Sequence, residues 1–165
     1  DPDNAEAATL DLADIFRGSM RRADQLISLK EELSLARQYL DMEQRRLGER
    51  LEIDWRVDEL PSGAAVLPLL LQPLLENAVA HGIQAHEGGG KLSVYGRAEG
   101  DEVVITIGNP LAPEGHSSGG NGMAIENIRE RLVFAFGSRA RLMTNRDTEQ
   151  FYAVLVVPHV EHSDH

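Results

Sequence analysis

Gly48 divides the sequence into two parts with different hydrophobic periods, and this change limits the chain to a mixed fold. Before Gly48, leucines recur every seventh residue, with Leu29 and Ala36 at the offset position, which predicts a long helix with an apolar seam. After Gly48, apolar and polar residues alternate over residues 51–57, as in a half-buried strand. The seam consists of Leu26, Leu33, Leu40 and Leu47.

This seam could pack either on the chain's own domain or on another molecule. Charged residues fill the other faces of the predicted helix, as on a helix with one apolar stripe. No second helix of similar length is predicted, so we expect a helix from outside the chain to cover the seam. We therefore interpret residues 1–47 as part of a dimerisation helix followed by a linker.

The rest of the chain predicts hairpins separated by a few helices. Hairpins are expected over residues 91–107 and 139–157, where short alternating runs are joined by turn residues. A strongly apolar helix is expected over residues 67–81 with Gly82 as its C-cap, and another helix over about 123–136. Strands grouped in this way indicate an α+β sandwich, in which helices cover one face of a mostly antiparallel mixed sheet.

Composition bounds the class of protein. The 165 residues suffice for one domain, which we place at residues 48–158, followed by a C-terminal tail, 159–165, that we expect to be frayed. A formal net charge of −11 argues against nucleic acid as a partner. The absence of cysteine excludes disulfides and thiolate metal sites. No apolar run approaches the roughly 20 residues of a membrane-spanning helix.

The apolar helix carries the first group of candidate site residues. Asn77 and His81 are four residues apart and share one face, and Glu76 lies beside them. A carboxamide oxygen is a suitable ligand for Mg²⁺, and a neighbouring carboxylate can orient or deprotonate a nucleophile. These residues could equally be the solvated face of an amphipathic helix.

A glycine-rich turn before the last predicted helix is the second candidate feature. Glycines let a backbone approach a ligand closely, and the N–H groups at a helix N-terminus favour an anion. The same composition would also suit a flexible hinge. The turn reads Gly119-Gly120-Asn121-Gly122-Met123-Ala124.

The order of these features resembles the ATP-binding domain of sensor histidine kinases, whose Bergerat (GHKL) fold is shared with gyrase, Hsp90 and MutL. Residues 72–82 are similar to the N-box of the LytS-type branch, and residues 127–132 to the stretch after its glycine box. In this branch a connecting segment joins the dimerisation helix to the catalytic domain. The residues of this chain that resemble that segment are Glu32-Leu33, Tyr39-Leu40, Glu43 and Arg46.

This resemblance implies ATP and Mg²⁺ as cofactors and assigns roles to residues. Asn77 would ligate Mg²⁺, and Glu76 would be the general base that activates a phosphoacceptor histidine. His81 would reach the phosphates. The cradle and hinge of the nucleotide lid would be formed by Gly120, Gly122 and Met123.

Two departures from the family pattern stand out. The stretch Ile107-Gly108-Asn109-Pro110 matches a family segment whose aspartate binds the adenine amino group, and we align Gly108 with that aspartate. Binding of adenine should then be weak and poorly selective, unless Asn109 binds the base instead. The phosphoacceptor motif is also missing, and we expect it on a helix that precedes residue 1.

The resemblance implies the catalytic domain of a two-component protein-histidine kinase, which transfers the γ-phosphoryl group of ATP to that histidine. The whole protein would be an inner-membrane sensor, and this chain a soluble cytoplasmic domain of it. Expected partners are a second copy, paired through the N-terminal helices, and a cytoplasmic response regulator of the LytTR type, such as AlgR.

Two alternatives stay open at this point. The chain could be a degenerate module that binds nucleotide weakly and serves as a dimeric scaffold, a reading that Gly108 favours. It could also be an ATP-hydrolysing clamp of the gyrase or Hsp90 kind, which uses no phosphohistidine. The resemblance of the N-terminal residues to a dimerisation helix speaks against the clamp.

Overall fold

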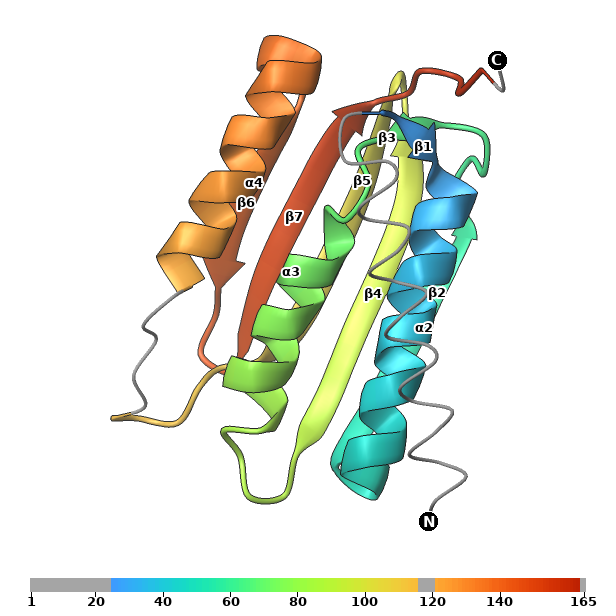
Figure 1. The fold of residues 1–165 in the computed structure, drawn as a ribbon. Helices are drawn as coiled ribbons and strands as arrows, with labels where there is room; N and C mark the ends of the chain where they lie inside the picture. The colour runs from blue at the N-terminus through green and yellow to red at the C-terminus, as the bar shows by residue number, and fades with distance from the viewer. Residues whose placement is uncertain (1–24, 116–120, 164–165) are drawn as a thin grey trace.

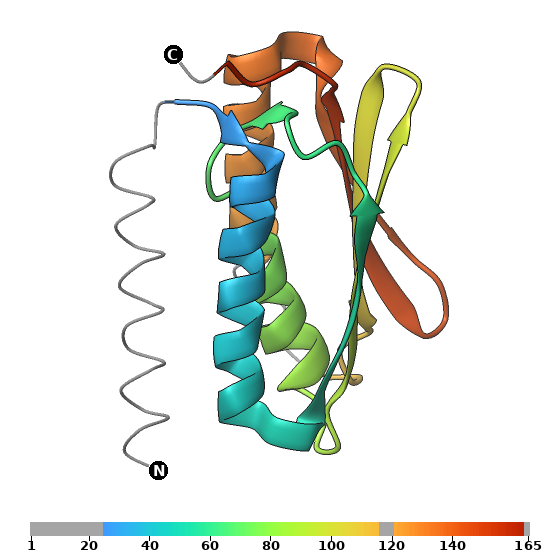
Figure 2. The ribbon, with the colours of Figure 1, turned by 90° about the vertical axis from the view of Figure 1, so that its right-hand side faces the viewer.

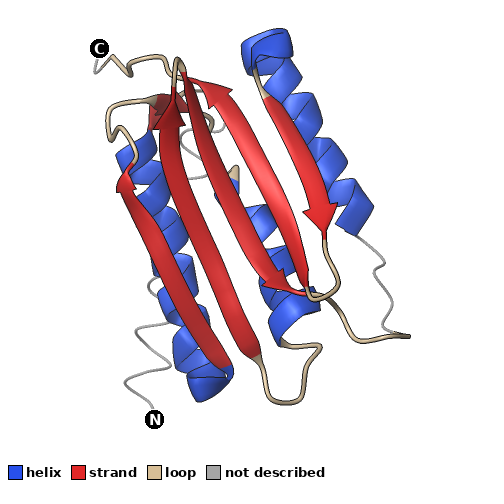
Figure 3. Cartoon of the chain, turned by 180° about the vertical axis from the view of Figure 1, so that it is seen from behind, coloured by secondary structure: helices blue, strands red, loops and turns tan. Residues whose placement is uncertain are grey.

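The structure, a computed structural model, describes residues 25–115 and 121–163. It has two layers, a five-stranded sheet and a layer of helices (Figure 1). In the described part of the chain the helices cover one face of the sheet (Figure 2), and the other face carries none (Figure 3). The predicted α+β sandwich is confirmed.

The sheet is mixed and mostly antiparallel, as predicted. Its strand order is β2-β4-β5-β7-β6, in which β2 runs parallel to β4 and every other neighbouring pair is antiparallel. Both predicted hairpins are present, one formed by β4 and β5 and the other by β6 and β7. The strands are β2 (Leu51–Glu59), β4 (Gly90–Glu99), β5 (Glu102–Pro110), β6 (Arg141–Arg146) and β7 (Gln150–Pro158).

Helix α2 (Leu29–Leu47) packs into the core of its own domain. Ser28 caps its N-terminus by accepting a hydrogen bond from the backbone N–H of Glu31 at 3.2 Å. The seam lies against α3 and β2, with Leu40 fully buried and only Leu26 notably exposed, at 37%. The expectation of an outside helix is therefore wrong for residues 29–47. The short helix η1 (Gly48–Arg50) joins α2 to β2.

Helix α3 (Leu71–Asn77) begins later than predicted, and the helical chain continues two residues past the predicted end at His81. Its start is delayed because Leu69 has a left-handed backbone conformation, with φ = 56°. The chain then continues as a π-helical segment, η2 (Ala78–Ile83), so Gly82 is not the C-cap. A Cβ on Gly82 would lie 2.7 Å from the Cβ of Asn109, so glycine is required there by the close approach of β5.

Helix α4 (Asn121–Phe136) agrees with the second predicted helix and is followed by the short helix η3 (Gly137–Arg139). Its inner face buries Ile128 and Leu132 in the same core as α2 and α3. None of the described helices is long and apolar enough to cross a membrane.

Residues 159–162, which follow β7, are held by backbone pairing and are not frayed as expected. A two-stranded sheet of β1 (Ile27–Ser28) and β3 (Ala65–Val66) lies next to them. The backbone N–H of Ala65 donates to the carbonyl oxygen of Val160 at 2.6 Å, and the N–H of His162 donates to that of Gly63 at 2.7 Å. Backbone pairing of this kind leaves no side-chain pattern in a sequence.

Candidate functional site

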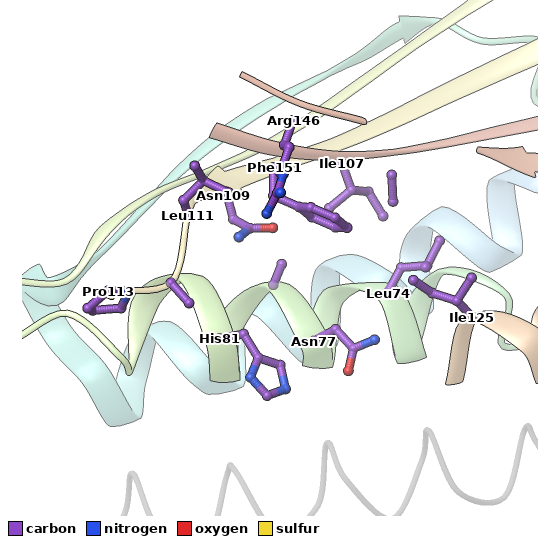
Figure 4. A pocket seen from close by; sticks show the side chains of 13 residues that line it. Leu74, Asn77, His81, Ile107, Asn109, Leu111, Pro113, Ile125, Arg146 and Phe151 are labelled. Carbon is purple, nitrogen blue, oxygen red and sulfur yellow. The ribbon is translucent and has the colours of Figure 1, made fainter. Parts of the chain in front are cut away.

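A cavity of about 430 Å³ lies between the helix layer and the sheet (Figure 4). We call its two sides the helix wall and the sheet wall. The helix wall consists of Leu74, Asn77, Ala78 and His81, and the sheet wall of Ile107, Asn109, Arg146, Phe151 and Ala153. The cavity is completed by Leu111, Ala112, Pro113 and Ile125.

Two of the predicted site residues meet on the helix wall. Asn77 and His81 are half-buried and lie one helical turn apart on the same side of the helix (Figure 4). Glu76 does not line the cavity: its carboxylate is exposed and accepts a hydrogen bond from Nε2 of Gln72 at 3.0 Å. The helix therefore separates an amide and an imidazole inside the cavity from a carboxylate in contact with solvent.

Asn109 supplies the one buried polar side chain of the sheet wall. Its Nδ2 donates to the carbonyl oxygen of Pro110 at 2.8 Å, which fixes the orientation of the carboxamide. The carboxamide oxygen is turned toward the space between sheet and helix (Figure 4). The sheet wall thus presents a fixed hydrogen-bond acceptor to the cavity.

Gly108, by contrast, belongs to the other face of the sheet. Side chains alternate along a strand, and both neighbours of Gly108 line the cavity. A Cβ at position 108 would point instead toward the ring of Tyr152, 3.1 Å away, and toward Ser93. A carboxylate at this position could not reach the cavity. The alignment of Gly108 with a base-binding aspartate is therefore wrong, and of the two neighbouring residues Asn109 is the one that lines the cavity.

Sequence reasoning missed two residues of the sheet wall. Phe151 and Arg146 line the cavity but are not among the site residues predicted from the sequence. Strand pairing puts Arg146 opposite Phe151 and Phe151 opposite Asn109, so the three residues form a row across β6, β7 and β5. Counting the alternation outward from Asn109 through both hairpins would have identified them.

Comparison with known proteins agrees with this fold and site. A family model described as "Histidine kinase" matches residues 1–51. The sensor protein LytS of Staphylococcus saprophyticus is 28% identical over 172 residues, covering 96% of this chain and 29% of that protein. The sensor histidine kinase YpdA of Escherichia coli is 30% identical over 146 residues, covering 82% and 26%. The chain is a relative of LytS-type sensor proteins.

Solved structures show the same fold at lower sequence identity. The catalytic domain of histidine kinase ThkA superposes with a TM-score of 0.62 at 13% identity, covering 82% of this chain and 98% of that one. Full-length ShkA in complex with AMPPNP gives a TM-score of 0.59 at 19% identity, covering 84% and 32%. The LytS-type relative described here therefore has the fold of a histidine kinase catalytic domain. It spans less than a third of the length of LytS and YpdA.

The glycine-rich turn before α4 is only partly described. Gly120 lies outside the described residues, and Gly122 falls in the first turn of α4. Met123 is 75% exposed and does not line the cavity, whereas Ile125, two residues further along α4, does. The predicted cradle and lid hinge therefore stay predictions.

The charges around the cavity favour an anionic ligand. Among the described residues that line it there is no carboxylate, and Arg146 contributes a guanidinium. Outside the cavity, burial and the negative charges of Glu43 and Glu76 raise the pKa of Tyr39 on α2 above its usual range. No group of three or more histidine, cysteine, aspartate or glutamate side chains in the described part of the chain could hold a metal ion.

Proposed function

We propose that this chain binds Mg-ATP in the cavity and is the catalytic domain of a two-component protein-histidine kinase. The observation that carries the proposal is that Asn77 and His81 from the helix and Asn109 from the sheet line one cavity, with no carboxylate among the described residues that line it. ShkA, which has this fold, was solved in complex with the ATP analogue AMPPNP. Relatives named as sensor histidine kinases support the same reaction.

The adenine base would occupy the sheet wall, between apolar side chains and Asn109. The exocyclic amino group of adenine is a donor, and the fixed carboxamide oxygen of Asn109 is an acceptor for it. Guanine carries a carbonyl oxygen at that position and would leave two acceptors facing each other. Phe151 and Ile107 supply the apolar surface that a purine ring requires. We therefore propose selective binding of ATP.

The triphosphate and Mg²⁺ would occupy the helix wall. One amide oxygen, from Asn77, fits Mg²⁺ because this ion keeps several waters and takes its remaining ligands from substrate phosphates. Bound Mg²⁺ would neutralise phosphate charge during transfer. His81 lies one turn from Asn77 and would donate to a phosphate oxygen.

The phosphoryl group would pass to a histidine that lies outside residues 1–165, on a helix approaching from the solvent side of α3. Glu76 suits the role of its general base because its carboxylate is exposed beside the cavity. ThkA was solved in complex with the response regulator TrrA. We propose a response regulator of the LytTR type for this chain, and pairing of two copies through their N-terminal helices in the whole protein.

The fold removes the main reason for the alternative of a degenerate scaffold. That alternative relied on Gly108 in place of a base-binding side chain, and position 108 faces away from the cavity. A cavity with a correctly oriented acceptor is what a nucleotide-binding domain needs.

Transfer of radiolabelled phosphate from ATP to a separate LytS-type fragment that contains the phosphoacceptor helix tests the proposal. We expect labelling of that fragment and no labelling of residues 1–165. Glu76→Gln should slow the transfer by about a hundredfold or more, the usual contribution of a general base, and leave ATP affinity nearly unchanged. Glu99→Gln, at an exposed glutamate of the β4–β5 hairpin, is the matched control. An unlabelled acceptor fragment, or full activity of Glu76→Gln, would contradict the proposed chemistry.

A further inference from the structure

A carboxylate that does not line the cavity is buried where three helices meet. Glu32 on α2 is 1% exposed. Its two carboxylate oxygens accept hydrogen bonds from the backbone N–H groups of Leu69, at 2.9 Å, and Leu71, at 3.3 Å. The residue before α3 is Leu70, which offers no capping side chain, so α2 supplies the N-terminal cap of α3 from outside.

The same loop is held from its other side by α4. The guanidinium of Arg131 donates to the carbonyl oxygen of Leu69 at 3.1 Å and to that of Pro68. The N–H groups of the loop thus point to α2 and its carbonyl groups point to α4. Leu69, held by both, is the one non-glycine residue with a left-handed backbone among those the structure describes. Contacts from two helices maintain this unfavourable conformation.

Burial of the Glu32 carboxylate and the Arg131 guanidinium costs desolvation free energy. Apolar residues of similar volume would fill the junction without that cost. Burial raises the pKa of Glu32 to about 7, although the loop N–H groups and the charge of Arg131 act in the opposite direction. Burial also lowers the pKa of Arg131, against the effect of Glu32. The pair is therefore poorly explained by stability alone and well explained by a need for fixed geometry.

The three helices joined here have different places around the cavity. Helix α3 carries Asn77, and α4 contributes Ile125 at the cavity's end. Helix α2 lies within the residues that match the histidine kinase family model. A displacement of α2 would reach both α3 and α4, each of which lines part of the cavity, through one loop.

We propose that Glu32 and Arg131 are positioning residues that fix α3 and α4 relative to α2, so that a movement of α2 alters nucleotide binding. Its effect on ATP rests on the proposed function, whereas the mechanical link among the helices does not. Neither residue touches the nucleotide; both act through the loop that precedes α3.

Calorimetric titration with Mg-ATP, well below the melting temperature, tests the effect on binding. Glu32→Gln keeps the shape but leaves one oxygen for two N–H groups, and Arg131→Met keeps the length without donors. Each should weaken binding about five- to tenfold, a usual range for coupled sites. The double variant should bind Mg-ATP as tightly as whichever single variant binds it less tightly, because both changes release the same loop. Asp41→Asn, in the exposed Arg37–Asp41 pair of α2, should bind like the unmodified chain.

Amide hydrogen exchange without nucleotide separates this proposal from the proposed function. Glu32→Gln should speed exchange along α3 to Asn77 and along α4, while β2 and β4 exchange as before; a loss of general stability would affect all elements. If Glu32→Gln does not fold, Arg131→Lys, which keeps the charge but loses the forked donor, should give the same pattern.

Faster exchange confined to residues 68–71 would overturn the positioning role, as would unchanged or additive affinities in a chain that binds ATP. If the unmodified chain does not bind Mg-ATP, the proposed function fails, and the exchange pattern alone decides the mechanical link.

Discussion

The two walls of the cavity differ in how their polar groups are arranged. The helix wall places Asn77 and His81 one turn apart in a single segment of chain. The sheet wall brings Asn109, Phe151 and Arg146 together from three strands, and their alignment depends on two hairpin registers. The cavity-lining residues of the helix wall can therefore be predicted from their spacing in the sequence. For the sheet wall, the prediction also requires knowing which face of the sheet each side chain lies on.

The walls also differ in their support. Behind the helix wall lies a buried ionic junction, in which Glu32 and Arg131 hold the loop before α3. The sheet wall rests on continuous strand pairing and carries one buried polar side chain, Asn109, among the residues described. We expect the helix wall to be the adjustable side of the site and the sheet wall the fixed one.

The largest effect is expected from Asn77→Ala on the helix wall. If Asn77 holds the metal, this variant should lose the Mg²⁺-dependent rise in melting temperature that ATP causes, because a ligand stabilises only the state it binds. Thermal unfolding with ATP, with and without Mg²⁺, measures this. Asn127→Ala, at an exposed asparagine of α4, is the control. An unchanged shift in Asn77→Ala would exclude the role.

A second prediction concerns the support of the helix wall. The pKa of Glu32 is raised from 4.5 to about 7 by burial, so the unfolded chain releases this proton at lower pH than the folded chain. The contribution of Glu32 to the free energy of unfolding should therefore fall as pH rises from about 4.5 to about 7, by about 3 kcal/mol. Urea unfolding of the unmodified chain and of Glu32→Gln across this range checks it. Identical pH dependence in both would contradict the prediction.

Contact between the walls is tested by Gly82→Ala. The new Cβ would clash with Nδ2 of Asn109 and lie 2.7 Å from its Cβ, so the strand and helix must separate. We expect a loss of about 1–3 kcal/mol in the free energy of unfolding and weaker ATP binding. Gly88→Ala is the matched control, because no atom lies within 4 Å of its added Cβ. Equal stability of the two variants would show that the walls are not in close contact.

The smallest effect is expected from Gly108→Asp. Its side chain would approach Tyr152 on the helix-free face, with a stability loss of about 1 kcal/mol from crowding. The ratio of ATP to GTP affinity should stay as in the unmodified chain. A gain in ATP preference would show that a side chain at position 108 does reach the cavity.

Much of the fold was predictable because alternation identifies strands and turn residues identify hairpins. The seam of α2 was assigned to the wrong partner, since a repeat such as Leu33, Leu40 and Leu47 defines an apolar stripe but not what covers it. The need for glycine at position 82 could not be inferred from the sequence. It arises from the close approach of Asn109, which is 27 residues away in the chain and adjacent in space.

For the site, the spacing of Asn77 and His81 sufficed to place both in one cavity. The choice between Gly108 and Asn109 did not follow from sequence, because a shift of one residue along a strand moves a side chain to the other face. The junction of Glu32 and Arg131 was also out of reach, since its bonds go to backbone groups of residues 68–71.

Calorimetric titration of the unmodified chain with Mg-ATP and with Mg-GTP tests the central claim most directly. The acceptor of Asn109 should pair with adenine and be left unsatisfied against guanine, a difference of about 1–3 kcal/mol. We therefore predict that ATP binds about 5- to 150-fold more tightly than GTP. Equal affinity for the two nucleotides, or no binding of either, would contradict a base-selective nucleotide site in this cavity.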